Sequence, residues 1–150
     1  MCLAAGGCGD DDDGGDGPDG GADTSGGGGG SSDQAAVRKA LEDLFQAFAV
    51  KDVEKACSLL SADAREKAAA TVPNTDTCEE GTRRILDLVD SRERESLPEQ
   101  LEGTKIVVEV TGDKAEVVFP ERPNADRVPA VREGGEWRID HNPLTYKPNK

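Results

Sequence analysis

The sequence predicts an α+β fold in which three N-terminal helices pack on a curled antiparallel sheet of about four strands. Two observations lead to this expectation. Apolar residues recur at helical spacing from about residue 34 to residue 90, and they alternate with polar residues after residue 103. A run of helices followed by a run of strands is typical of an α+β layout, in which one face of the sheet lies on the helices.

The first two helices are indicated by their starts and by their apolar faces. Ser31 with Gln34 three residues later fits a capping box, which opens a helix from about residue 34 to residue 50. Its apolar positions follow helical spacing: Val37, Leu41, Leu44, Phe45 and Phe48. Asp52 fits the cap of a second helix. That helix carries one apolar face, formed by Val53, Ala56, Cys57 and Leu60.

A third helix is predicted after the break at Pro73 and Asn74. Thr77 and Glu80 form another capping box, and the helix extends to about Asp90. Its inward positions are expected to be Ile85, Leu86 and Val89. Pro98 ends whatever element follows.

Two hairpins are predicted in the last third of the chain. Ile106, Val108 and Val110 alternate with other residues before a turn at Gly112-Asp113, and the alternation resumes at Ala115, Val117 and Phe119. The second hairpin joins a strand at 128–132 to one at 137–139. Gly134-Gly135 lies between them and suits a tight two-residue turn.

The first 33 residues differ in composition from the rest of the chain. They hold 13 of the 18 glycines and eight aspartates, without Lys or Arg, and the remaining 117 residues carry 23 acidic and 18 basic side chains. Residues 9–33 contain almost no apolar side chain, so we expect a disordered, extended linker. The net charge of −13 argues against nucleic acid as a partner. The Asp/Gly run lacks the regular period of a calcium-binding repeat.

The segment Leu3-Ala4-Ala5-Gly6-Gly7-Cys8 resembles the end of a bacterial lipoprotein signal peptide. The resemblance implies cleavage before Cys8, lipidation of Cys8 and anchoring to the extracytoplasmic face of the cell membrane. The family prefers Leu where this chain has Ala5, and it needs a basic start and an apolar stretch. Because neither precedes Cys8 here, we expect the reading frame to begin upstream of Met1. The alternative is an acidic tail on an intracellular domain.

The order of helices and strands resembles the NTF2-like (cystatin-like, SnoaL/DUF4878-type) superfamily. The stretches that resemble it are "ALEDLFQAFAVKDVEKACSLLS", "TCEEGTRRILDLV", "GDKAEVVF" and "REGGEWRID". The resemblance covers residues 34–142, leaves 143–150 as a C-terminal tail, and implies a cone formed by the curled sheet. The chain departs from the family because no strand is evident between the second and third helices.

Cys57 and Cys78 remain as a pair once Cys2 is lost with the signal peptide and Cys8 is lipidated. In an exported protein such a pair is expected to form a disulfide. Two reduced, buried thiols and a redox-active Cys78 at a helix N-terminus stay as alternatives. A zinc site is disfavoured because the chain has one histidine, His141.

The sequence indicates no catalytic residue and no cofactor. Asp140 and His141 are the adjacent acid and imidazole, but neighbours on a strand point to opposite faces. Trp137 is expected in the core, with a partner for its indole N–H. We therefore expect a cell-envelope lipoprotein whose domain binds a small apolar ligand or a protein. The alternative is an NTF2-like enzyme of the isomerase or dehydratase type, which buried carboxylates or Tyr pairs in a cavity of the cone would favour.

Overall fold

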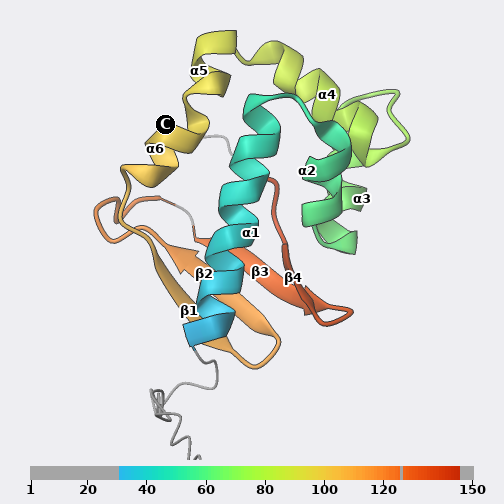
Figure 1. The fold of residues 1–150 in the computed structure, drawn as a ribbon. Helices are drawn as coiled ribbons and strands as arrows, with labels where there is room; N and C mark the ends of the chain where they lie inside the picture. Colours follow the sequence, from blue (N-terminus) through green and yellow to red (C-terminus); the bar gives the residue numbers. More distant parts are fainter. Residues whose placement is uncertain (1–30, 126, 146–150) are drawn as a thin grey trace, which may run out of the picture.

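A computed structural model of the chain describes residues 31–125 and 127–145. These residues form an α+β fold in which a helix, α1 (Ser31–Ala49), crosses one face of a four-stranded antiparallel sheet (Figure 1). Further helices pack beside α1 and lead the chain back to the sheet. The predicted linker at 9–33 and the predicted C-terminal tail at 143–150 fall mostly outside the described residues.

Six α-helices are present in the described part of the chain, where the sequence indicated three. After α1 come α2 (Val53–Leu59), α3 (Ala62–Thr71), α4 (Cys78–Leu88), α5 (Ser91–Glu95) and α6 (Leu97–Glu102). The expectation of a single second helix is wrong because that segment divides at Leu60, whose backbone is extended. Ser61 then caps α3 by accepting a hydrogen bond from the Ala64 N–H at 3.1 Å.

Neither of the two predicted capping boxes forms in full. Thr77 accepts a hydrogen bond from the Glu80 N–H at 3.2 Å, as a capping box requires, but the Glu80 carboxylate pairs with Arg84 one turn onward. Helix α1 begins at Ser31 rather than at residue 34. The Gln34 amide, which we assigned to a capping box, donates to the carbonyl of Val108 in the sheet.

The sheet has the order β1-β2-β3-β4, and all its pairs are antiparallel. Its strands are β1 (Val107–Thr111), β2 (Lys114–Val118), β3 (Val128–Glu133) and β4 (Glu136–Ile139). Both predicted hairpins are confirmed. Gly112, Gly134 and Gly135 have positive φ, the conformation that tight two-residue turns require.

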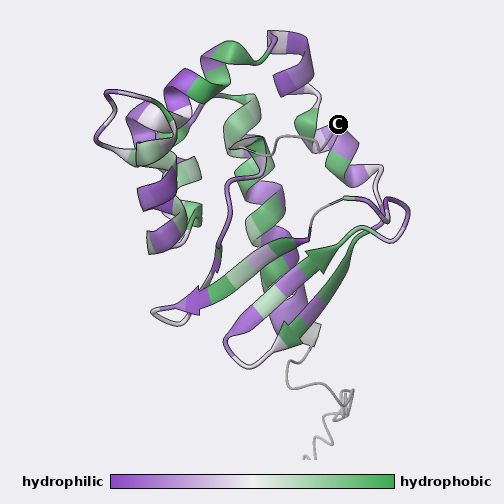
Figure 2. Cartoon of the chain, turned by 180° about the vertical axis from the view of Figure 1, so that it is seen from behind, coloured by the Kyte–Doolittle hydropathy of each residue, from purple (hydrophilic) through white to green (hydrophobic). Residues whose placement is uncertain are grey.

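The core lies between α1 and the face of the sheet that α1 covers, which we call the inner face. Period-2 alternation sends every second strand residue there, and along the strands apolar and polar segments alternate in Figure 2. The largest fully buried apolar side chains come from both layers and from the flanking helices: Val37, Leu41, Leu44, Phe48, Leu60, Leu86, Val117 and Ile139.

A helical lobe of α2, α3 and α4 flanks this core. The predicted pairing of Cys57 with Cys78 is present as a disulfide with a Cα–Cα distance of 6.1 Å, and it joins α2 to α4. The buried Thr82 hydroxyl lies 3.6 Å from the Cys57 sulfur and 3.8 Å from the Cys78 sulfur. Helices α3 and α4 touch at Gly81, where a Cβ atom would lie 2.2 Å from the carbonyl oxygen of Ala68.

Candidate functional site

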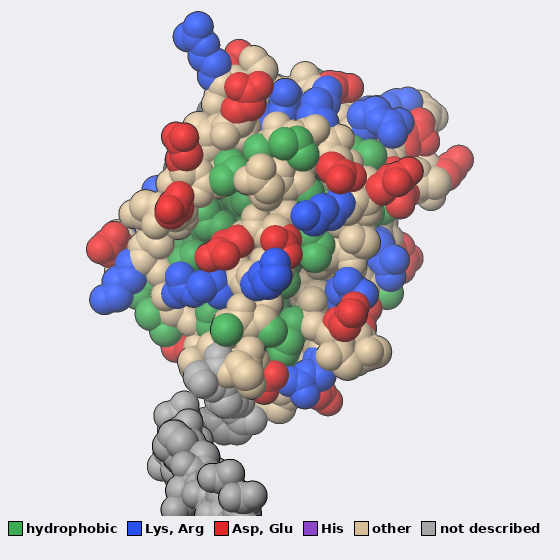
Figure 3. Space-filling model, viewed as in Figure 1, with side chains coloured by type: hydrophobic (Ala, Val, Ile, Leu, Met, Phe, Trp, Pro, Cys, Tyr) green, Lys and Arg blue, Asp and Glu red, His purple; other side chains and the backbone are tan. Residues whose placement is uncertain are grey.

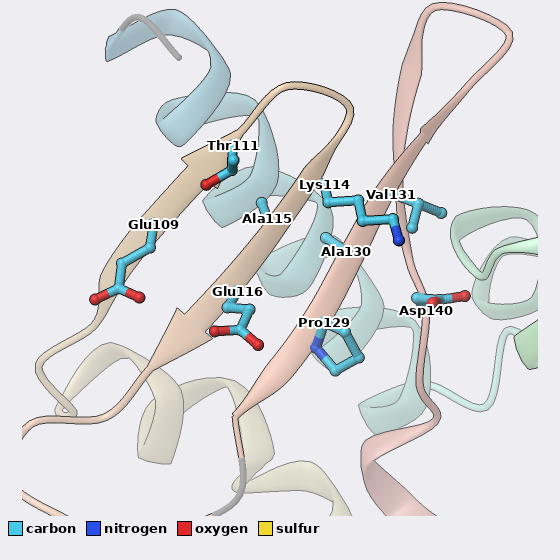
Figure 4. Close-up of a pocket in the computed structure, with 9 residues that line it drawn as sticks. All are labelled: Glu109, Thr111, Lys114, Ala115, Glu116, Pro129, Ala130, Val131 and Asp140. Atoms are coloured by element: carbon cyan, nitrogen blue, oxygen red, sulfur yellow. The ribbon is translucent and has the colours of Figure 1, made fainter. Parts of the chain in front are cut away.

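The face of the sheet opposite α1, which we call the outer face, carries the candidate site. No described helix covers it when the molecule is seen from behind (Figure 2). A pocket of about 340 Å³ lies on this face (Figure 4). Outward-pointing strand positions supply most of its side chains, whereas Ala115 and Ala130 point inward and Asp140 follows β4. The residues that line the pocket are Glu109, Thr111, Lys114, Ala115, Glu116, Pro129, Ala130, Val131 and Asp140.

Two glutamates face each other at one end of the pocket. Glu109 on β1 and Glu116 on β2 are direct cross-strand partners, an arrangement in which like charges repel. Arg127, just before β3, bridges them with ion pairs of 3.0 Å to Glu109 and 2.7 Å to Glu116. The hydrogen bond from Arg127 to Glu116 and the charges of both carboxylates raise the pKa of this guanidinium. Arg127 therefore stays charged and offsets the repulsion.

A lysine and an aspartate form the other end of the pocket. The Lys114 side chain extends over β3 toward Asp140, which follows β4 (Figure 4). Asp140 accepts a hydrogen bond from the hydroxyl of Ser61, the buried cap of α3. This bond fixes the carboxylate, whereas the ammonium of Lys114 sits on an exposed side chain. The half-buried Pro129 and Val131 provide an apolar surface between the two charged ends.

Asp140 and His141, the adjacent acid and imidazole, do not act together in this arrangement. Asp140 is bonded to Ser61, and within the described residues no hydrogen bond or ion pair joins it to His141. His141 is half-buried just beyond β4. In the described residues, Asp140 is therefore paired with Ser61 and not with His141.

The inner face presents a packed interior rather than a lined cone. Trp137 is buried there, as predicted, and its indole N–H donates to the Asp33 carboxylate at 3.1 Å. The Arg132 guanidinium lies over the Trp137 ring at 4.9 Å from its centroid and also pairs with Asp33. These contacts join the start of α1 to the β3–β4 hairpin. Deeper between α1 and the sheet, the side chains are apolar and buried, as Leu41, Leu44 and Val117 are.

The two remaining predicted site features have different outcomes. Cys57 and Cys78 form the structural disulfide described above, with both side chains buried. Cys8, the predicted lipidation site, lies outside the described residues. In the part of the chain that the structure describes, no three His, Cys, Asp or Glu side chains gather as a metal site.

The surface over α1 and the neighbouring helices mixes both signs of charge. Figure 3 shows acidic and basic side chains interspersed on this face, without a basic patch. Several of them pair one helical turn apart, as Lys39 does with Asp43 at 2.9 Å. None of the helices within residues 31–125 and 127–145 has the length and hydropathy of a membrane span.

The pocket's residues were missed from the sequence, although a signal for them exists. The alternation that places Val108, Val110 and Val117 inward also places Glu109, Lys114 and Glu116 on the outer face. The alternation does not predict that this face is hollowed into a pocket. It also does not predict the hydrogen bond from Ser61 to Asp140. Chemically, the arrangement offers one fixed acceptor, one cation and an apolar strip, which suits binding by hydrogen bonds and surface contact.

Comparison of the chain with known protein families, with curated proteins and with solved structures finds no match.

Proposed function

We propose that this chain is a lipid-anchored protein of the cell envelope whose α+β domain follows an NTF2-like plan and binds a partner protein on the outer face of its sheet. The N-terminal sequence supports the envelope location: small residues precede Cys8, and a Gly- and Asp-rich linker follows it. The Cys57–Cys78 disulfide agrees with an oxidising compartment. Helices that precede a curled antiparallel sheet support the NTF2-like plan.

One observation carries the binding proposal. The only large sheet surface free of described helices is also the surface with a 340 Å³ pocket, and it carries both signs of charge around half-buried Pro129 and Val131. The interior, by contrast, is filled by side chains such as Leu41, Phe48 and Val117. A small apolar ligand would need to displace these side chains, whereas a protein partner can use the outer face as it stands. The outer face is therefore the better candidate for binding.

The lipid anchor is tested by labelling cells that express the natural reading frame, upstream codons included, with an alkyne fatty acid. We expect the protein to take up the label and to sediment with membranes, and Cys8→Ala to abolish both. Cys2→Ala is the matched control, because Cys2 lies in the segment that cleavage removes. Unlabelled wild-type protein in the soluble fraction contradicts the anchor.

The binding surface is tested separately by placing a photo-crosslinking amino acid at Thr111, which lines the pocket, in the same cells. We expect a discrete crosslinked species that Lys114→Glu weakens, because that change reverses the charge of the pocket's cation. Arg65 on the exposed side of α3 is the control position. Equal crosslinking at both positions contradicts a specific surface.

A further inference from the structure

β1 is an edge strand, and its backbone has groups that point away from the sheet. The two-residue turn at Gly112-Asp113 makes Thr111 and Lys114 the closing pair, so residues 107, 109 and 111 bond to β2. The backbone groups of Ile106, Val108 and Val110 therefore face outward. Such a row of N–H and C=O groups is a template for pairing with another strand.

Two side chains of α1 occupy two of the acceptors of this edge. The Gln34 amide donates to the Val108 carbonyl at 3.2 Å, and the Arg38 guanidinium donates to the Ile106 carbonyl at 2.9 Å. We call Gln34 and Arg38 the edge-capping pair. The spacing fits because four helical residues advance about 6 Å and two strand residues advance about 6.6 Å. Side chains four residues apart on α1 can therefore each reach one of the outward-facing carbonyls of β1.

The opposite edge of the sheet, at β4, is covered by a different set of contacts. The Ser61 N–H donates to the Ile139 carbonyl at 2.9 Å, and Leu60 forms a parallel bridge with Ile139. Arg138 on β4 donates to the Ser58 carbonyl. β4 is thus covered by backbone from the α2–α3 link, whereas β1 depends on two side chains, which a substitution can remove.

The β1 segment is well suited to pair with itself. Residues 106–110 read Ile-Val-Val-Glu-Val, which has high β-propensity, one charge and neither Pro nor Gly. Val107 adds an apolar side chain at the edge that is 40 % exposed. We propose that the edge-capping pair keeps this domain monomeric by blocking antiparallel pairing of β1 with β1 of a second copy.

The test is light scattering of the full chain after size-exclusion chromatography, over a range of protein concentrations. We expect a monomeric wild type and, for Gln34→Ala/Arg38→Ala, a dimer whose share rises with concentration. Lys39→Ala/Gln46→Ala is the matched control, because it removes one amide and one positive charge from exposed positions of the same helix. This control is expected to stay monomeric.

A rescue variant identifies the surface that pairs. Adding Val107→Lys to the double variant places a charge at the edge and is expected to restore the monomer. A double variant that stays monomeric with a native circular dichroism spectrum overturns the proposal, and so does a dimer that the rescue leaves intact. If the double variant does not fold, the single variant Gln34→Ala is measured by light scattering and judged by the same outcomes. Gln34 is exposed in the first turns of α1, so this variant is expected to fold. A wild type whose Val108 and Val110 amides gain exchange protection with concentration also overturns the proposal.

Discussion

At the scale of single residues, Gly81 sets how closely α3 and α4 approach. A glycine inside a helix costs about 1 kcal/mol relative to alanine, so helix propensity alone would favour Ala at this position. The space does not allow it, because the Cβ atom would lie 2.2 Å from the backbone oxygen of Ala68. A backbone atom cannot rotate away as a side chain can, so the steric conflict outweighs the propensity.

We expect Gly81→Ala to lower the free energy of unfolding by about 1–3 kcal/mol, the usual range for overpacking. The measurement is urea denaturation followed by circular dichroism. Gly103→Ala is the control, because its Cβ atom would meet only the Glu99 carbonyl at 3.4 Å and its φ is −75°. That variant is expected to be neutral or slightly more stable. Equal effects of the two substitutions contradict the close approach.

At the scale of elements, the disulfide is the covalent link between α2 and α4. It closes a loop with a sequence separation of 21, within which α3 lies. In the chain-entropy picture, a loop of this length makes the unfolded state less favourable by about 3 kcal/mol. Helix α3 is lined inward only by alanines, Ala64 and Ala68, so its own burial contributes little.

We expect Cys57→Ala/Cys78→Ala to lower the thermal midpoint by about 10 °C for a domain of this size. The measurement is a calorimetric scan of both proteins with and without a reductant. The reductant should lower the wild-type midpoint toward that of the variant and leave the variant unchanged. A wild type that is indifferent to full reduction of the bond, checked by thiol titration, contradicts this expectation.

An ion pair links the α1–α2 connection to α4. The hydrogen bond from Lys51 lowers the pKa of Asp87 below its ordinary value of 3.8. Because the folded-state pKa is the lower one, the pair stabilises the fold above pH 3.8 and loses this effect as the pH falls through the folded-state value. Lys51 has positive φ, so the connection turns sharply at this residue.

We expect Asp87→Asn to reduce stability at pH 7 and to flatten the acid limb of the stability curve below pH 3.8. The measurement is urea denaturation at pH steps from neutral to acid. Asp63→Asn is the control, because Asp63 also pairs with a lysine but both partners lie on α3. Trypsin cleavage after Lys51 reports on the α1–α2 connection, and Asp63→Asn should leave this cleavage unchanged. Equal cleavage of both variants contradicts the link.

The elements show which structure follows from local sequence and which does not. The strands and their turns were predictable, because alternation at Val108, Val110 and Val117 and the glycines at the turns act locally. The division between α2 and α3 was not predictable from local sequence. The apolar positions of the two helices continue one pattern, and the break at Leu60 is stabilised by the Ser61 N–H bond to Ile139, 78 residues further along. The pocket on the outer face depends on the same distant contact, through Ser61 and Asp140.

At the scale of the whole molecule, the buried core of the described residues is built from segments between α1 and β4. Its first member in sequence is Val37 and its last is Ile139. The contacts nearest the N-terminal linker are those of Asp33 with Arg132 and Trp137, which tie the start of α1 to the β3–β4 hairpin. The first 30 residues contribute seven of the aspartates, so they carry much of the net charge of −13.

We expect removal of residues 1–30 to leave the thermal midpoint within about 2 °C of the full chain. Their composition predicts a solvated linker, and charges on such a linker are screened beyond about 8–10 Å. The measurement is thermal unfolding followed by the emission of Trp137, the one tryptophan. A truncation that begins at Ala35 is the control. It also removes Asp33 and Gln34, so it deprives Arg132 and Trp137 of their shared partner and should unfold at a lower temperature. A large drop on removing residues 1–30 alone would mean that the linker packs on the domain, in which case it could not serve as a free tether.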